Sequence, residues 1–84
     1  MGRREKLLEK MRRSPTSVRY DEIENLLLSV RCRVTKRGSH RTFRHSLVPG
    51  NMITIVERHP MKAPCVRSAL VLYEEIEEAI HGDN

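Results

Sequence analysis

Three stretches of the chain repeat their apolar residues with a helical period. The first covers residues 3–13, where a narrow apolar stripe lies among charges, and it predicts a short amphipathic helix. The second begins at Tyr20 and carries acidic residues in or near its first turn, where the helix dipole favours negative charge. The third runs from Pro64, which suits the first position of a helix, to Gly82. The three stripes consist of Leu7, Leu8 and Met11; of Ile23, Leu26, Leu27 and Val30; and of Val66, Ala69, Leu70, Tyr73, Ile76 and Ile80.

Between the second and third helices the period of the pattern changes from 3.6 to 2. Residues 31–36, 40–45 and 51–56 each alternate, and turn-rich stretches separate them. This predicts three short strands in an antiparallel meander. One face of the sheet is then expected to join the core, through Cys32, Val34, Phe43, Ile53 and Ile55.

These elements predict an α+β fold of the order helix, helix, strand, strand, strand, helix. Two helices must cover one face of the three-stranded antiparallel sheet, because its other face is too polar to be core. Residues 14–18 contain Pro15 and read as a linker, so we divide the chain into an N-terminal helix and linker, 1–18, and a main domain, 19–82. We interpret the helix at 3–13 as a packing element, and a partner interface is the alternative.

Composition limits the size and the partners of this fold. Eighty-four residues suffice for one small core, and 38% hydrophobic with 32% charged residues is typical of a soluble protein. The net charge of +5 and the pI of about 9.8 favour a polyanionic partner, most commonly nucleic acid. No apolar run approaches the roughly 20 residues that span a bilayer, and the N-terminus lacks the apolar stretch of a secretory signal. We therefore expect no membrane partner and a cytoplasmic location.

The outward face of the predicted sheet is rich in basic and hydroxyl side chains. Arg and Lys offer charge-assisted hydrogen bonds to phosphate oxygens, and His exchanges a proton near neutral pH. His40 is the titratable group within this face, which makes it a candidate acid–base residue. The alternative is a solvated strand face whose charges discourage edge pairing. The outward residues are Arg31, Arg33, Thr35, His40, Thr42, Arg44, Met52, Thr54 and Val56, and Lys36, Arg37 and Arg41 flank His40 in sequence.

The spacing of the histidines and cysteines argues against a metal or a thiol nucleophile. His40 and His45 are five residues apart, so on one strand they point to opposite faces. We interpret His45 as a hydrogen-bonded structural residue. Cys32 falls on the core face, where a thiol stays protonated and inert, and with only one other cysteine, Cys65, free thiols are expected. We expect no metal site and no cofactor.

Three strings of the sequence, KRGSHRTFRH, MITIVERHP and KAPCVRSAL, occur in this order. Together they resemble the HicA (YcfA-like) toxin family of bacterial and archaeal toxin–antitoxin systems, over about residues 20 to 80. The chain departs from the family at Arg31 and Cys32, where relatives usually carry glycine and an aromatic residue, and in the loop HPMK, which lacks glycine. The matching positions are Gly38, Ser39, His40, Phe43, Arg44, His45, Ile53, Thr54, Ile55, His59, Lys62, Pro64, Val66, Arg67 and Leu70.

The resemblance implies a double-stranded-RNA-binding-domain-like fold and a ribonuclease that cleaves mRNA, with His40 as the required histidine. It also implies a protein partner, a cognate HicB-type antitoxin that covers His40 and the basic face. Our hypothesis is metal-independent cleavage, in which His40 acts as general base on a ribose 2′-OH. The candidate RNA-binding residues are Arg33, Lys36, Arg37, Gly38, Ser39, Arg41, Arg44 and Lys62.

Two other functions fit the same residues. One is a non-catalytic RNA-binding module, which needs the basic face but no histidine. The other is a protein-interaction module whose basic sheet face binds an acidic partner.

Overall fold

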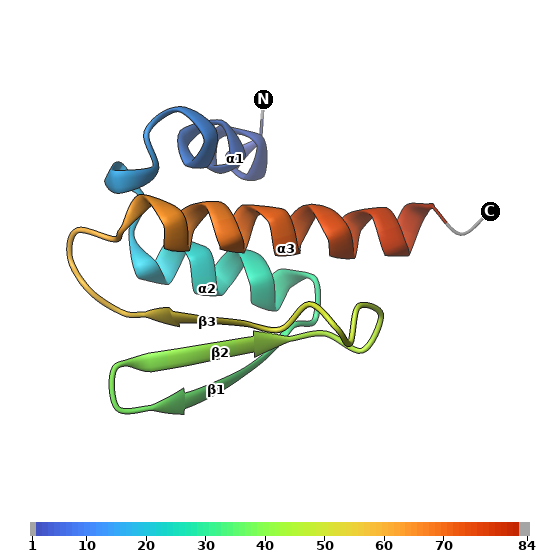
Figure 1. Cartoon of the computed structure of the whole chain (residues 1–84). Helices are drawn as coiled ribbons and strands as arrows, with labels where there is room; N and C mark the ends of the chain where they lie inside the picture. Colours follow the sequence, from blue (N-terminus) through green and yellow to red (C-terminus); the bar gives the residue numbers. More distant parts are fainter. Residues whose placement is uncertain (1, 83–84) are drawn as a thin grey trace.

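The helices and strands follow the order that the hydrophobic pattern predicts. The computed structural model describes residues 2–82. Its elements are α1 (Arg3–Arg13), α2 (Tyr20–Ser29), β1 (Arg33–Arg37), β2 (His40–Arg44), β3 (Ile53–Val56) and α3 (Ala63–His81), with a short 3-10 turn, Pro15–Ser17, within the predicted linker. The α+β class and the element order are confirmed (Figure 1).

The strands form an antiparallel sheet of order β1-β2-β3. Residues that pair across the three strands form rows. One row consists of Val34, Phe43 and Ile53, and the neighbouring row consists of Thr35, Thr42 and Thr54. Successive rows point to opposite faces, because side chains alternate along a strand. Helices α2 and α3 both lie on the face that carries Phe43, as predicted, and no helix within residues 2–82 covers the other face (Figure 1).

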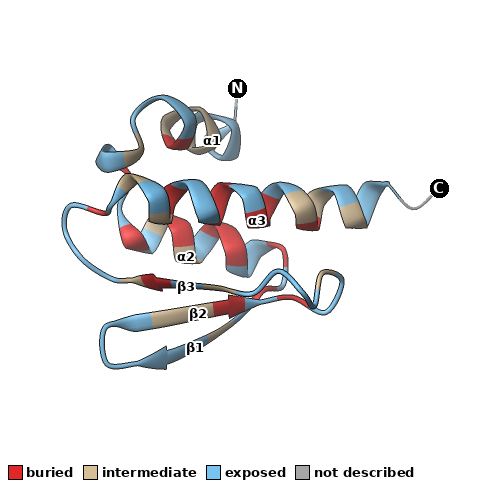
Figure 2. Cartoon of the chain, in the orientation of Figure 1, coloured by how far each residue is buried: buried red, intermediate tan, exposed pale blue. Residues whose placement is uncertain are grey.

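One hydrophobic core lies between the helices and the covered face of the sheet. Phe43 and Ile55 contribute from the strands, and both are fully or almost fully buried. Each large apolar side chain that is removed from water in this way stabilises the fold by about 1.5–3 kcal/mol. Figure 2 shows the buried segments of α2 and α3 on the sides that face each other and the sheet. The largest fully buried side chains from the helices and loops are Met11, Val18, Ile23, Leu27, Met61, Val66, Leu72 and Ile76.

Helix α1 packs on α3, on the side away from the sheet (Figure 1). Met11 is 0% exposed and belongs to the same core as the other helices. The Arg12 guanidinium lies 3.0 Å from the Glu74 carboxylate of α3, and the Lys10 ammonium lies 3.0 Å from Glu22 of α2. The interpretation of this helix as a packing element is confirmed.

The first strand begins later than the alternation suggested. Arg31 and Cys32 belong to the turn that ends α2, and β1 starts at Arg33. Helix α3 begins at Ala63, one residue before Pro64. Within residues 2–82, no helix is both long and apolar enough to cross a membrane.

Candidate functional site

The uncovered face of the sheet consists of three rows of side chains that run across the strands. At one end Arg33 pairs with Arg44, and at the other end Arg37 pairs with His40, which also pairs with Val56. Strands rise about 3.3 Å per residue, so the two basic rows lie about 13 Å apart. The row Thr35, Thr42 and Thr54 lies between them. We call these eight residues the open face.

Hydroxyl groups fill the middle of the open face. The Thr42 and Thr54 Oγ1 atoms lie 3.0 Å apart and share a hydrogen bond, and an Arg44 Nη2 donates to Thr35 Oγ1 at 3.5 Å. Two aromatic residues, Tyr20 and Phe43, lie near the sheet. Their side chains are buried on its other face. Among the described residues, the open face therefore offers cations and hydroxyls to a ligand, and its one ring is the His40 imidazole.

A two-residue turn brings His40 to the edge of this face. Gly38 has a φ of 60°, a conformation that glycine adopts without steric cost, and it stands at the first of the two loop positions, as in a type II′ hairpin. Ser39 fills the second position, and its carbonyl accepts a hydrogen bond of 2.9 Å from the Glu57 N–H. His40 is exposed, and its imidazole forms no hydrogen bond with any residue in the range 2–82.

The arginines of the open face have no acidic partner among the described residues. None of Arg33, Arg37 and Arg44 forms an ion pair with a carboxylate in the described part of the chain. Uncompensated guanidinium groups on an exposed surface attract anions and form charge-assisted hydrogen bonds with phosphate oxygens. The open face thus combines a titratable imidazole with three arginines available to a polyanion.

Two of the candidate RNA-binding residues, Lys36 and Arg41, lie on the opposite side of the sheet. They pair with each other across β1 and β2, one residue away from the Arg37–His40 pair, so both point toward the helices. The Lys36 ammonium lies 3.3 Å from the Glu24 carboxylate, and an Arg41 Nη2 lies 2.8 Å from the Glu57 carboxylate. The structure therefore does not bring these two side chains to the face that carries His40.

Arg41 instead holds the hairpin from behind. Its Nη1 donates to the Gly38 carbonyl at 2.6 Å and to the His40 carbonyl at 3.1 Å. Its guanidinium carbon lies 5.8 Å from the centre of the Tyr20 ring, within the range of a cation–π contact. Only 14% of its side chain is exposed. We call Arg41, Tyr20 and Glu57 the hairpin clamp, because together they fix the backbone on either side of the turn that presents His40.

Acidic and aromatic groups behind the hairpin shift one another's pKa. The neighbouring Tyr20 hydroxyl and then the Lys36 ammonium lower the pKa of Glu24 below its ordinary value of 4.5, although burial opposes this. Burial, together with Glu24, raises the pKa of Tyr20. At neutral pH Glu24 is therefore ionised and Tyr20 is neutral.

The lowered pKa of Glu24 makes the fold sensitive to acid. A carboxyl whose pKa is lower in the folded state stabilises the fold above its unfolded pKa, and this stabilisation is lost as the pH falls through the folded value. In urea unfolding at pH 7, we expect the Glu24→Gln protein to have a lower free energy of unfolding than the parent. This difference should shrink as the pH falls below the ordinary glutamate pKa of 4.5, because Glu24 of the parent is then protonated as well. A difference between variant and parent that stays constant with pH would contradict the assignment.

His45 and Cys32 have structural positions, as predicted. His45 is buried, its Nε2 lies 2.7 Å from the Val30 carbonyl, and the Leu47 N–H donates to its Nδ1 at 3.0 Å. The tautomer that satisfies both contacts carries its proton on Nε2, so both ring nitrogens are used. Burial raises the pKa of the Cys32 thiol to about 11, which keeps it protonated at neutral pH. Both cysteines are free.

The remaining predicted residue, Lys62, lies away from the open face. It is exposed at the N-terminal end of α3, on the loop that follows β3. This loop and the β1–β2 hairpin lie at the same end of the molecule (Figure 1).

No group of three or more His, Cys, Asp or Glu side chains arranged for a metal ion occurs among residues 2–82.

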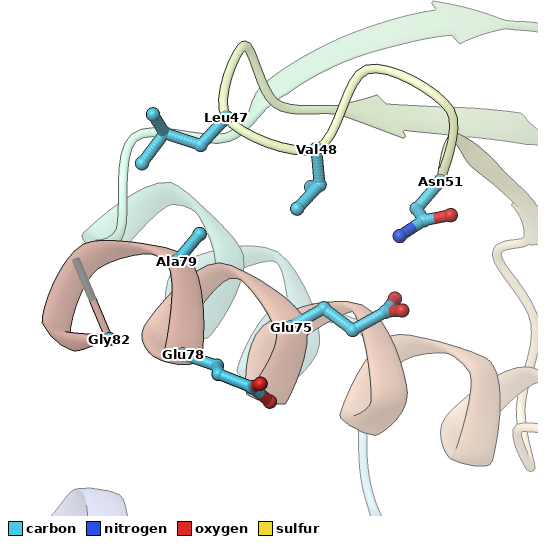
Figure 3. A pocket seen from close by; sticks show the side chains of 7 residues that line it. All are labelled: Leu47, Val48, Asn51, Glu75, Glu78, Ala79 and Gly82. Atoms are coloured by element: carbon cyan, nitrogen blue, oxygen red, sulfur yellow. The ribbon is translucent and has the colours of Figure 1, made fainter.

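A cavity of about 540 Å³ lies far from His40, between the loop after β2 and the C-terminal half of α3. Figure 3 shows the side chains that line it, among them Asn51, Glu75 and Glu78. His40 begins β2, whereas this loop follows its other end. The described residues that line the cavity include neither a histidine nor a basic side chain, so the open face and not this cavity carries the candidate chemistry.

Comparison with known proteins finds no match for this chain among protein-family models, curated proteins or solved structures.

Proposed function

We propose that this protein is an endoribonuclease that cleaves mRNA in the cytoplasm, as the toxin of a type II toxin–antitoxin pair of the HicA kind. One observation carries the proposal. His40 stands on an uncovered sheet face beside Arg37, with Arg33 and Arg44 two rows away and no carboxylate paired with any of them in the described residues. A base beside arginines without carboxylate partners suits a substrate in which a hydroxyl group that must lose its proton lies next to phosphate groups.

In the proposed mechanism His40 removes the proton from a ribose 2′-OH. The 2′-oxygen then attacks the adjacent phosphorus, the bond to the 5′-oxygen of the next nucleotide breaks, and a 2′,3′-cyclic phosphate forms. Water protonates the departing 5′-oxygen, and the hydroxide ion that remains takes the proton from His40, which is exposed to solvent. Arg37, the cross-strand neighbour of His40, would stabilise the charge that builds up on the phosphate oxygens. The reaction needs no metal ion.

The open face also suits the ribose and the backbone of RNA. The Thr42 and Thr54 hydroxyls each accept and donate hydrogen bonds, as a 2′-OH does. Since no Phe, Tyr or Trp side chain of the described residues lies on this face, the proposed contacts are mainly to sugar and phosphate, and we expect binding to weaken steeply with salt.

The proposal includes a protein partner. A HicB-type antitoxin would cover His40 and the arginines of the open face with an acidic surface and so compete with RNA. Complementary charge of this kind favours rapid association.

A non-catalytic RNA-binding module is the second candidate, and one observation favours it. Neither a second acid–base residue nor a hydrogen-bond partner for the His40 imidazole is present on the open face, whereas an enzyme commonly orients its base. Such a module would bind RNA as proposed here and leave it intact.

Cleavage by the purified protein tests the proposal and separates the two candidates. We expect an end-labelled RNA to be cut internally in excess EDTA, with 2′,3′-cyclic phosphate on the upstream product and a 5′-hydroxyl on the downstream product. Mass spectrometry of the fragments identifies these ends. RNA that is bound but not cut would exclude the ribonuclease and support the binding module.

A further inference from the structure

Arg31 occupies a backbone position that usually belongs to glycine. At the end of α2 the Cys32 N–H donates to the Leu27 carbonyl at 3.1 Å, and the Arg31 N–H donates to the Leu28 carbonyl at 3.0 Å. This pair of hydrogen bonds defines a Schellman motif, in which the residue after the cap adopts a left-handed conformation. Arg31 has a φ of 71° and is the one described residue other than glycine with a positive φ.

A side chain at this position costs stability. Its Cβ crowds the backbone in the left-handed region, which is why glycine is the usual residue there. A strained non-glycine residue points to a function for its side chain, so the surroundings of Arg31 are informative.

Arg31, Arg33 and Arg44 line a single cavity of about 380 Å³ at the end of the sheet away from His40. Arg33 and Arg44 are cross-strand partners, and Arg31 joins them from the turn before β1. Ser46 and Met52 also line the cavity, as does His45, both of whose ring nitrogens already have partners.

No acidic side chain lines this cavity, and none of its arginines is ion-paired with a carboxylate of residues 2–82. Arg31 also borders a neighbouring cavity that contains Glu77, whose Oε2 lies 3.4 Å from the His81 Nε2. Arg44 also donates from Nη2 to Thr35 Oγ1 at 3.5 Å, a contact that leaves its positive charge uncompensated. Three positive side chains that line one space repel each other, and an anion that enters the space reduces this repulsion.

We propose that the Arg31–Arg33–Arg44 cavity is a binding site for a phosphate group. Guanidinium groups donate paired, charge-assisted hydrogen bonds, and a phosphate offers several oxygens to more than one of them at once. The phosphate comes either from the backbone of a bound nucleic acid or from a free or terminal phosphate group. In the first case the proposal rests on the proposed function, and the phosphate bound here is not the one beside His40, because the two rows are about 13 Å apart.

The test uses Arg31→Gly, which is expected to raise the stability of the fold while it weakens phosphate binding. Glycine relieves the strained backbone, so we expect the melting temperature to rise by about 4–8 °C. Loss of one guanidinium should weaken binding of inorganic phosphate at least about 10-fold, as measured by NMR shift titration. Arg44→Ala should weaken it to a similar degree. Arg3→Ala removes the same charge from the exposed surface of α1 and should leave phosphate affinity unchanged.

A second arm of the titration identifies the source of the phosphate. If Arg31→Gly weakens binding of both inorganic phosphate and a short RNA without a terminal phosphate, the cavity holds a backbone phosphate. If it weakens only inorganic phosphate, the cavity holds a free or terminal group. Phosphate affinity that is the same in the parent, Arg31→Gly and Arg44→Ala proteins would overturn the proposal. The inorganic phosphate arm does not involve His40, so this failure is distinct from a failure to cleave RNA.

Discussion

Replacing His40 by alanine is expected to lower the rate of RNA cleavage about 10²–10⁴-fold, the usual contribution of a positioned general base. His40 is exposed on a sheet face whose cations remain in place, so the fold should not change. RNA affinity should stay within a factor of a few, because arginines and not the imidazole supply the charge.

Single-turnover cleavage and filter binding on the same RNA measure these two effects separately. His81→Ala is a suitable control, since it removes an exposed histidine at the end of α3 and should leave both values unchanged. Cleavage at the parental rate by the His40→Ala protein would remove His40 from the mechanism.

Replacing Arg41 by alanine is expected to lower the free energy of unfolding by about 2–3 kcal/mol. The change removes charge-assisted hydrogen bonds to the Gly38 and His40 carbonyls, the ion pair with Glu57 and the contact with the Tyr20 ring. The hairpin that presents His40 should loosen, so we also expect faster amide hydrogen exchange in β1 and β2 and slower RNA cleavage.

Arg37→Ala provides the matched control, because Arg37 also lies in the hairpin but points to the open face. Its unfolding free energy should stay within about 0.5 kcal/mol of the parent, whereas its RNA affinity should fall. Urea unfolding of both variants decides the matter. Equal stability of the Arg41→Ala and Arg37→Ala proteins would show that the hairpin clamp does not hold the turn.

The periodicity of apolar residues was sufficient to predict the elements and the two faces of the sheet. A period of 2 places Phe43 on one face and His40 on the other, and pairing across the strands preserves this arrangement because antiparallel partners point the same way. The buried position of His45 follows from the same alternation, because His45 is an odd number of residues from His40 and so points to the opposite face.

The partners of long basic side chains could not be predicted in this way. The period of 2 places Arg41 on the same side of its strand as Phe43, yet its basic side chain made it a candidate for a phosphate contact. Whether such a side chain reaches solvent depends on acids elsewhere in the chain, and here Glu24 and Glu57 approach from α2 and from beyond β3. The sequence does not specify these tertiary contacts.

The turn after α2 escaped prediction for a different reason. The left-handed residue that ends a helix is usually glycine, which makes the position recognisable in a sequence. In this chain the position is occupied by Arg31. The alternation of residues 31–36 therefore suggested a strand that began too early. The same alternation did place Arg31 on one side with Arg33 and Arg44, and these three residues line one cavity.

The most direct test of the account is cleavage of one RNA oligonucleotide and of a copy with a single 2′-deoxyribose at the cleaved position, with the purified protein in EDTA. The 2′-OH at that position is the proposed nucleophile. We predict that the all-ribose strand is cut to a 2′,3′-cyclic phosphate and that the substituted strand binds equally well but is not cut there. Equal cleavage of both strands, or of neither, would contradict the central claim.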